Sequence, residues 1–293
     1  MQVVVHSRVY KEQDRPYIQH LFDILAEAKV TTYVYGEYLD QLPEDFDTRQ
    51  EVGRFDGYLD FKVRDIDFVI TMGGDGTILD AATVVRDAGV PIMGINLGRL
   101  GFLASIGKGY IHRSIRALQR DAYKLDERRL LQVETSQPIF GDLNFALNDC
   151  TLLKRDTSSM ITIHTYINGE FLNSYWADGI IVATPTGSTG YSLSCGGPII
   201  FPNSGNFVIT PVAPHNLNVR PIVISDKSVI SFEIEGRADS FLCTLDSRCE
   251  PITSKHQLAV RRADHTVNLV RMNDRDFLWT IREKLAWGKD ARN

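Results

Sequence analysis

The stretch at residues 66–78, IDFVITMGGDGTI, decides the fold of the first part of the chain. Its apolar residues predict a buried strand over Ile66–Met72. Gly73-Gly74-Asp75-Gly76-Thr77 follows directly, and we expect a helix over Ile78–Ala88. A strand that passes through a glycine-rich turn into a helix is typical of a parallel sheet covered by helices.

The flanking sequence repeats this alternation of strand and helix. Apolar runs predict strands at Gln2–His6, Thr31–Tyr35 and Val90–Asn96. Pro16–Lys29 has helical spacing, and its apolar face consists of Ile18, Leu21, Phe22 and Leu25. Gly36–Asp67 is rich in Asp and Glu, which predicts a solvated, mobile loop or a weak helix.

After about Lys124 the pattern changes to short alternating strands with turn signals, including a hairpin at Asn168-Gly169. Asp276–Trp287 returns to helical spacing, with Phe277, Ile281 and Leu285 as one apolar stripe. The predicted fold class is an α/β N-terminal domain, with a parallel sheet and flanking helices, plus a β-rich C-terminal domain. Four of its strands are expected at Val229–Glu235, Phe241–Asp246, Leu258–Arg262 and Thr266–Met272.

Composition and net charge limit the classes of function that the chain can have. The 293 residues are 43% apolar and 24% charged, which is ordinary for a globular protein of one large or two smaller domains. The net charge of −5, with basic clusters no longer than two residues, predicts no nucleic-acid partner. Anionic ligands would therefore be held locally.

Local features of the sequence predict a cytoplasmic protein without a membrane span. MQVVVHSRVY at the start lacks the regions of a signal peptide. No uncharged apolar stretch approaches the roughly 18 residues that a transmembrane helix needs. The cysteines lack CxxC spacing and are expected as reduced thiols at Cys150, Cys195, Cys243 and Cys249.

The glycine-rich turn is a candidate anion site. Backbone amides of Gly73, Gly74 and Gly76 and the following helix N-terminus would favour phosphate oxygens. The turn has neither Walker A nor GxGxxG spacing. Asp75 would be repelled by a phosphate, unless it accepts a proton from an attacking hydroxyl or helps to hold Mg²⁺. The alternative is structural: Asp75 or Thr77 caps the helix.

A second candidate site is Asp178-Gly179, a strand over Ile180–Ala183, and the loop TPTGSTGYSLS at residues 184–194. Its hydroxyl and glycine residues offer many donors to phosphate or ribose, and Tyr191 offers a ring for a base. The alternative is a loop that caps a helix. Asn148-Asp149 could bind ribose hydroxyls, although such pairs are also common in turns.

Taken in order, these motifs resemble the NAD kinase family. The resemblance covers most of the chain, and its motifs are GGDG at 73–76, NLGRLGFLA at 96–104, ND at 148–149, DG at 178–179, TPTGST at 184–189, YSLS at 191–194, GGP at 196–198 and PVAPHNLNVR at 211–220.

The resemblance implies a Mg²⁺-dependent transfer of the γ-phosphate of ATP to the 2′-hydroxyl of the adenosine ribose of NAD, giving NADP. It implies an NAD kinase-like fold, in which residues 1–124 and the C-terminal helix at 276–293 form the α/β domain and residues 125–275 the β-rich, dinucleotide-binding domain. A homodimer or homotetramer is also implied. Mg²⁺ would be bound mainly through the ATP phosphates, without a set of protein ligands.

The resemblance also assigns site residues. Asp75 matches the catalytic base, Asn148 and Asp149 the pair that holds the nicotinamide-side ribose, and Asp178 a carboxylate near the nicotinamide. Other NAD-binding positions are Gly76, Phe102, Thr189, Gly190, Tyr191, Ser192, Leu193, Ser194 and Ala213. The phosphates of the donor would face Gly73, Gly74, Gly76, Thr77, Thr186, Gly187 and Ser188.

The sequence departs from the family pattern at three places. Asp149 stands where Glu is usual, and Gly190 where Ala is usual. Leu245–Arg248 replaces a turn resembling Trp-Asp-Gly-Gln, so no substrate contact is carried over there. For His215 a packing or turn role is favoured over a catalytic one. The rival functions are another kinase with a Gly-Gly-Asp-Gly loop, for a lipid or sugar phosphate, and an NAD-binding sensor without turnover.

Overall fold

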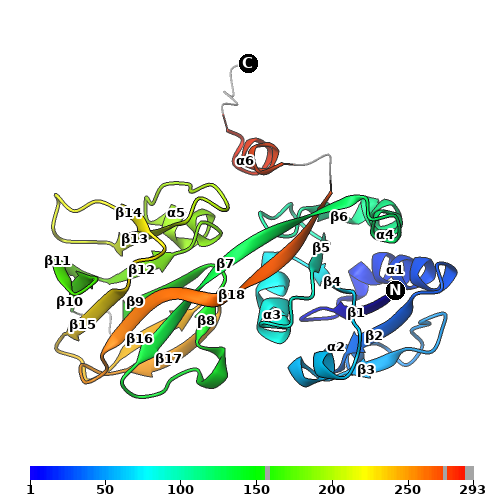
Figure 1. Ribbon diagram of the computed structural model, residues 1–293, viewed down its shortest axis with the longest axis horizontal. Coiled ribbons are helices and arrows are strands. Elements are labelled where there is room, and N and C mark those ends of the chain that lie inside the picture. Colours follow the sequence, from blue (N-terminus) through cyan, green and yellow to red (C-terminus); the bar gives the residue numbers. More distant parts are fainter. Residues whose placement is uncertain (156–158, 273–275, 288–293) are drawn as a thin grey trace. The chain divides into compact units, whose positions relative to one another are not determined.

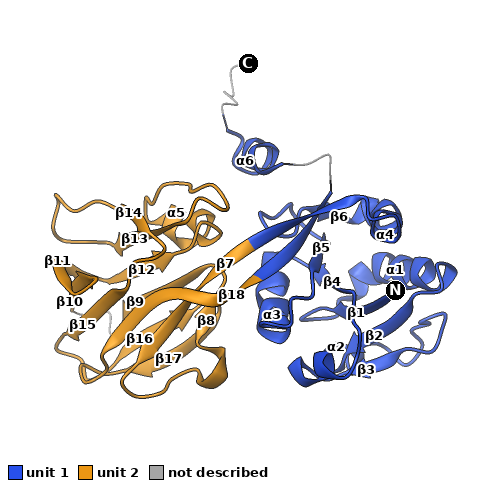
Figure 2. Cartoon of the chain, in the orientation of Figure 1, with its two compact units in different colours: residues 1–127, 267–293 blue, residues 128–266 orange. Residues whose placement is uncertain are grey.

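A computed structural model describes residues 1–155, 159–272 and 276–287 of the chain. The chain divides into two compact units (Figure 2). Unit 1 contains residues 1–127 and 267–293, and unit 2 contains residues 128–266. The long strands β7 (Tyr123–Thr135) and β18 (Leu258–Met272) carry the chain from one unit into the other (Figure 1).

Unit 1 is built on the predicted parallel sheet. Its strand order is β5-β4-β1-β2-β3, with every neighbouring pair parallel. Val4 in β1 lies opposite Val69 in β4, and nearly all residues of these central strands are buried. The strands span Gln2–His6 (β1), Thr31–Tyr35 (β2), Gly53–Phe55 (β3), Phe68–Gly73 (β4), Ile92–Asn96 (β5) and Ile106–Gly107 (β6, beside β5).

Helices pack their apolar residues against this sheet. The helix predicted at Pro16–Lys29 is confirmed as α1, and Ile18, Leu21, Phe22 and Leu25 on it are buried. It ends at Glu27 because Lys29 adopts a left-handed φ of 52°, a common way to terminate a helix. The helices of unit 1 are α1 (Arg15–Glu27), α2 (Gly36–Leu39), α3 (Asp75–Val85), α4 (Ile111–Gln119) and α6 (Phe277–Leu285).

The prediction of a solvated, mobile loop or weak helix over Gly36–Asp67 is wrong. The segment forms α2, the edge strand β3 and a short 3-10 helix at Tyr58–Lys62, and Tyr38 and Phe55 are fully buried. Such short elements contain too few residues to establish a periodicity. Their acidic residues face outward, where Asp40 and Asp56 both pair with Arg54.

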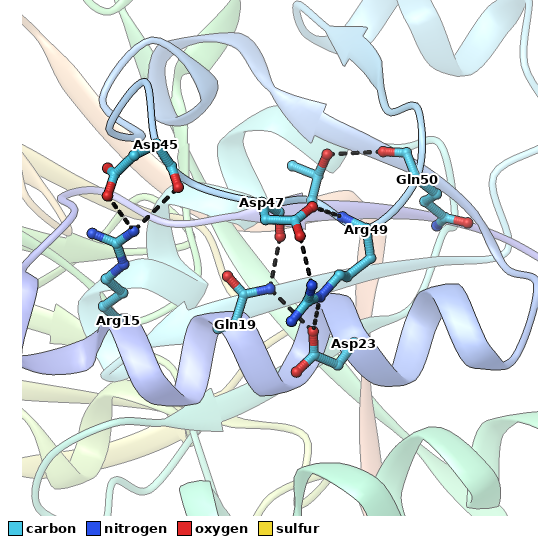
Figure 3. Close-up of polar contacts among 8 residues, drawn as sticks. Arg15, Gln19, Asp23, Asp45, Asp47, Arg49 and Gln50 are labelled. Carbon is cyan, nitrogen blue, oxygen red and sulfur yellow. Dashed lines mark hydrogen bonds and ion pairs between the residues drawn. The ribbon is translucent and has the colours of Figure 1, made fainter.

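Side chains spaced four residues apart on α1 bind the acidic part of this segment (Figure 3). Arg15 pairs with Asp45 at 2.8 Å, and Asp23 pairs with Arg49 at 2.8 Å. Gln19 between them donates to a main-chain carbonyl of the segment at 2.7 Å. Each exposed pair contributes little alone, but together they hold the segment along α1.

Unit 2 is the predicted β-rich part. One antiparallel sheet has the order β14-β13-β12-β9-β16-β17, and a second pairs β11, β10, β15 and the first half of β18. Their core joins residues of both sheets, among them Ile163, Ile180 and Phe241. The strands not yet placed are β8 (Phe145–Ala146), β9 (Asp149–Lys154), β10 (Ile161–Ile167), β11 (Glu170–Ala177), β12 (Gly179–Ala183), β13 (Asn206–Val212), β14 (Ile222–Ser225), β15 (Ile230–Glu235), β16 (Phe241–Leu245) and β17 (Arg248–Ile252).

Of two predictions in this half, one for a hairpin and one for a pair of separate strands, only the first is confirmed. The Asn168-Gly169 hairpin is confirmed, and both residues have the positive φ that such a turn requires. Separate strands at Leu258–Arg262 and Thr266–Met272 are wrong, because β18 is continuous. It pairs with β15 through Val260 and with β5 at Leu269, so one strand changes its partner along its length.

The remaining expectations concern the C-terminal helix, the thiols and the membrane. The predicted helix is confirmed as α6, which begins after Asp276, whose carboxylate caps it by accepting the N–H of Trp279 at 2.6 Å. All four cysteines are free thiols. None of the helices in the described ranges combines the length and apolar character that crossing a bilayer requires.

The buried ring of Tyr38 provides a test of packing in the Gly36–Asp67 segment. We expect Tyr38→Ala to lower the free energy of unfolding by about 3–5 kcal/mol, the usual cost of emptying an aromatic core position. Leu59→Ala, at a side chain that is 77% exposed, should change it by less than about 0.5 kcal/mol. Urea denaturation measures both values. Equal small losses would show that the segment contributes no core.

Candidate functional site

The glycine-rich turn connects β4 to α3 at the carboxyl edge of the parallel sheet. The cap of α3 is Gly74, with no side-chain cap bond, so the alternative in which Asp75 or Thr77 caps the helix is wrong. A Cβ on Gly73 would lie 2.1 Å from Oγ1 of Thr77. Gly73 therefore allows the turn to close tightly against the first turn of α3.

The Asp75 carboxylate accepts three consecutive backbone N–H groups. Its Oδ2 accepts from Phe102 at 2.8 Å, and its Oδ1 accepts from Leu103 at 3.0 Å and Ala104 at 2.9 Å. A Cβ on Gly101 would lie 1.8 Å from Oδ1, so this position must be glycine for the contact to form. The structure thus brings together two predicted site residues, Asp75 and Phe102.

Asp75 also faces a cation and remains accessible. Lys284 Nζ of α6 lies 3.6 Å from its Oδ2 and 4.8 Å from the centroid of the Phe102 ring. The Asp75 side chain retains 29% of its exposure, so a ligand hydroxyl can reach it. Lys284 was not predicted, because a lysine in a C-terminal helix gives no local signal of contact with a distant loop.

A pocket of about 510 Å³ lies beside the turn. Its walls come from the carboxyl ends of β1, β4 and β5, the edge where ligands bind in parallel α/β sheets. It is lined by the predicted residues Gly73, Gly74 and Thr77 and by three cations that sequence reasoning missed: Arg8, Lys11 and Arg99. Arg8 pairs with Asp80 at 2.6 Å. The pocket can hold a polyanion of nucleotide size.

In unit 2 the loop at residues 184–194 is ordered largely by its own hydroxyl groups. Ser188 donates to the carbonyl of Pro185 at 2.6 Å, and Ser192 shares a hydrogen bond of 2.8 Å with Thr210. Both serines are fully buried. Tyr191, at the start of α5 (Tyr191–Ser194), is 42% exposed and presents the most accessible ring of this loop.

The loop is joined to the Asn148-Asp149 pair. Thr184 donates through its hydroxyl to the carbonyl of Leu147 at 2.6 Å and through its N–H to that of Asn148 at 2.9 Å. A Cβ on Gly187 would lie 2.1 Å from the carbonyl oxygen of Asn148. A Cβ on Gly190 would lie 3.9 Å from the side chains of Asn148 and Asp149. The structure therefore places two predicted segments of unit 2, the loop and the Asn148-Asp149 pair, side by side.

Asp149 is buried next to a second carboxylate. Burial, with the negative charge of Asp246, raises the pKa of Asp149 to about 7. Burial also raises the pKa of Asp246, although three N–H groups and Arg248 oppose that shift. Because Asp246 accepts these N–H groups, which favour its charged form, we assign the shared proton near neutral pH to Asp149.

Three other residues of unit 2 named in the sequence analysis have surroundings different from those of Asn148 and Asp149. Asp178 forms an ion pair with Lys154 at 2.6 Å. Ala213, just after β13, is exposed and has a left-handed φ of 44°. The centroid of the His215 ring lies 4.3 Å from that of the Trp176 ring, and the backbone N–H of His215 donates to the Trp176 carbonyl, which agrees with a packing role.

Metal ligands are not clustered in the described part of the chain. No three His, Cys, Asp or Glu side chains there come together as a metal-binding group. Asp75 is the carboxylate nearest in sequence to the pocket glycines. Mg²⁺ in phosphate-binding sites is usually held by one or two carboxylates together with ligand phosphates.

Comparison with known proteins places the whole chain. Residues 3–123 match the family model of the ATP-NAD kinase N-terminal domain, and residues 147–272 match that of the ATP-NAD kinase C-terminal domain. The chain is 47% identical to an NAD kinase of Cytophaga hutchinsonii, over 99% of each chain. It is 41% identical to an NAD kinase of Flavobacterium psychrophilum, over the full length of both.

Two solved structures share the fold. A crystal structure of yeast NADH kinase complexed with NADH has a TM-score of 0.85 and 22% identity, covering 99% of this chain and 88% of that one. An NAD kinase from Archaeoglobus fulgidus in complex with ATP has a TM-score of 0.72 and 22% identity, covering 98% of each chain. The predicted fold class is thereby confirmed.

The two glycines near Asn148 should respond differently to a methyl group. We expect Gly187→Ala to lower the free energy of unfolding by about 1–3 kcal/mol, because its Cβ collides with a backbone carbonyl. Gly190→Ala is the matched control: its nearest contact is 3.2 Å, so a smaller loss is expected. Thermal and urea unfolding compare them. Equal losses would contradict the tight joint between the loop and Asn148.

Asp149 should make stability depend on pH. Its folded pKa of about 7 exceeds the unfolded value of 3.8, so the folded state holds an extra proton between these values. Stability contributed by Asp149 is therefore lost as pH rises from about 4 to about 7. Urea unfolding at pH 5, 6.5 and 8 should show Asp149→Asn gaining on the unchanged protein as pH rises. A difference that is constant with pH would contradict this assignment.

Proposed function

The chain belongs to the NAD kinase family, and on this premise we propose that Asp75 is the base for phosphoryl transfer from ATP to NAD, giving NADP. As a member of this family the chain is a phosphotransferase. The observation that carries the proposal is the Asp75 carboxylate, which three backbone N–H groups orient while part of it stays accessible. It directly follows Gly74, which lines the pocket.

The donor nucleotide is assigned to the pocket of unit 1. Backbone amides at Gly73 and Gly74 and the N-terminus of α3 favour phosphate oxygens. Arg8, Lys11 and Arg99 add positive charge to the pocket walls. These groups stabilise the charge that spreads over the transferring phosphoryl group, the main catalytic contribution in this chemistry.

The acceptor is NAD, through the 2′-hydroxyl of its adenosine ribose. This oxygen forms a bond to the γ-phosphorus, the bond from that phosphorus to the β,γ-bridging oxygen breaks, and ADP leaves. The hydroxyl proton passes to Asp75, whose carboxylate oxygens remain partly accessible. The transfer balances without a further reactant.

Each NAD-binding residue is proposed for a specific chemical contact. Asn148 and Asp149 offer an amide and a carboxylate to ribose hydroxyls, and the exposed ring of Tyr191 can stack on a base. Because Ser188 and Ser192 are buried and hydrogen-bonded within unit 2, we assign them to shaping the loop. The remaining proposed contacts are Gly76, Phe102, Asp178, Thr189, Gly190, Leu193, Ser194 and Ala213, with Thr77, Thr186 and Gly187 toward the donor.

Mg²⁺ belongs to the same proposal. When bound with the nucleotide, it neutralises charge on the phosphate oxygens. We propose that the ATP phosphates are its main ligands, as is usual for Mg²⁺ in nucleotide-binding sites.

A homo-oligomer in the cytoplasm completes the proposal. The four free thiols agree with a reducing compartment. Large apolar side chains stand exposed on unit 2, including Phe201 at 53% and Leu217 at 87%, and a second copy could cover them. Sedimentation velocity of the purified protein tests the assembly.

A coupled assay tests the function and the base together. We expect NADP to form only when NAD, ATP and Mg²⁺ are all present, as followed with an NADP-specific dehydrogenase. Asp75→Asn should lower kcat by about 10²–10⁴-fold, the usual contribution of a general base, with NAD binding largely kept. The control is Asp65→Asn, which changes an exposed carboxylate of the same unit.

Each other outcome has a definite meaning. Full turnover by Asp75→Asn would remove the role of Asp75 and leave the family activity standing. NAD binding without NADP formation, with ATP, other nucleoside triphosphates and polyphosphate all tried as donors, would instead favour a sensor without turnover.

A further inference from the structure

Asp246 lies in the two-residue turn of the β16–β17 hairpin, between the paired residues Leu245 and Arg248. It has a left-handed φ of 53°, and its backbone N–H binds the carbonyl of Asp149 at 3.1 Å. A two-residue hairpin turn requires this conformation, and Asp is one of the residues that adopt it readily.

The Asp246 carboxylate binds the turn that contains the Asn148-Asp149 pair. Its Oδ2 accepts the N–H of Leu147 at 2.9 Å, and its Oδ1 accepts those of Asn148 at 2.8 Å and Asp149 at 3.2 Å. Leu147 and Asn148 connect β8 to β9 and take no part in strand pairing, whereas Asp149 is the first residue of β9 and lies opposite Ala183. One side chain, that of Asp246, accepts the N–H groups of all three residues.

The carbonyl groups of the same turn accept hydrogen bonds from Thr184 and from the backbone of Asp246. Thr184 donates to the carbonyls of Leu147 and Asn148, while the N–H of Asp246 donates to that of Asp149. All six backbone polar groups of residues 147–149 are thus satisfied by Asp246 and Thr184. The conformation of this turn is fixed by the hairpin and by the loop at residues 184–194.

Arg248 anchors the hairpin itself. Its guanidinium donates to the carbonyls of Leu143 and Phe145, immediately before the turn. The hairpin therefore contacts the segment on both sides of Ala146, and its tip cannot shift without breaking bonds at Arg248 as well as at Asp246.

We propose that Asp246 is a positioning residue for NAD: by holding the backbone of Leu147–Asp149, it sets where the Asn148 and Asp149 side chains meet the ribose. The inference rests on the proposed function of that pair. Asp246 need not touch the dinucleotide, and its loss should weaken NAD binding more than ATP binding, because the pocket assigned to the ATP phosphates lies in unit 1.

The proximity of Asp246 to Asp149 also provides a measurable quantity, the pKa of Asp149. This pKa would not change with Asp246 if Asp246 only stabilised the fold. Asp149 is faced by Asp246 from the hairpin, by Tyr191 from α5 and by the adjacent thiol of Cys150, which is hydrogen-bonded to the thiol of Cys243. Burial raises the pKa of Tyr191, and the hydrogen bond with Cys243 together with burial raises the pKa of Cys150, so both stay neutral near pH 7. Removing the charge of Asp246 should then lower the pKa of Asp149.

The test is Asp246→Asn in the full-length protein, with steady-state kinetics from pH 5.5 to 8.5. We expect the KM for NAD to rise at least tenfold at pH 8, because an amide of the same shape retains a single, neutral acceptor oxygen. The KM for ATP should stay within twofold. The acidic limb of kcat/KM for NAD should move to lower pH.

Asp239→Asn is the matched control, since it removes a charge from the exposed loop just before β16. An Asp246→Asn protein that folds with an unchanged KM for NAD and an unmoved acidic limb overturns the proposal. So does a uniform fall in kcat at every pH with both KM values kept, because that indicates a smaller fraction of folded enzyme.

Hydrogen exchange in the unchanged protein keeps the proposal testable if the variant does not fold. The amides of Leu147, Asn148 and Asp149 should exchange as slowly as those of β9, and exchange as fast as exposed loop amides would overturn the role of Asp246. Absence of NADP formation by the unchanged protein would instead refute the proposed function. In that case calorimetric titration with NAD still measures the effect of Asp246→Asn on binding.

Discussion

A carboxylate that accepts three consecutive backbone N–H groups is the interaction on which both candidate sites depend. Asp75 does this for residues 102–104 in unit 1, and Asp246 does it for residues 147–149 in unit 2. Successive N–H groups form a concave, electropositive nest, and hydrogen bonds to a charged acceptor are roughly twice as strong as neutral ones. Each aspartate therefore fixes a segment that lies mostly outside the paired strands.

The neighbours of these two aspartates give them different roles. Asp75 is next to the ammonium group of Lys284 and the cation-lined pocket, so its charge is offset where a polyanion would arrive. Asp246 is next to Asp149, and two buried carboxylates cannot both ionise cheaply. The proton that stays on Asp149 near pH 7 follows first from the burial of this side chain and then from the negative charge of Asp246. The buried carboxylates that fix the geometry of the turn thus lower the stability of the folded protein.

The sequence predicted what depends on long, regular patterns. The parallel sheet, the Asn168-Gly169 hairpin and α6 followed from apolar runs, turn residues and helical spacing. It did not predict β3 and α2, which are too short to show a period, or the continuity of β18, whose partner changes along its length. The contacts of Asp246 and Lys284 join segments far apart in the chain, and no local pattern records such a contact.

The glycines of the two sites fall into two physical classes. Gly73, Gly101 and Gly187 are required by the protein, because a Cβ there would lie about 2 Å from a neighbouring atom. Gly74 is different: a Cβ would meet nothing within 4 Å among the described residues, and its φ of −120° suits any residue. Packing and backbone conformation thus leave Gly74 free to carry a side chain. An open backbone amide at a helix N-terminus is what a phosphate oxygen needs for close approach, so we infer that the constraint at Gly74 comes from the ligand.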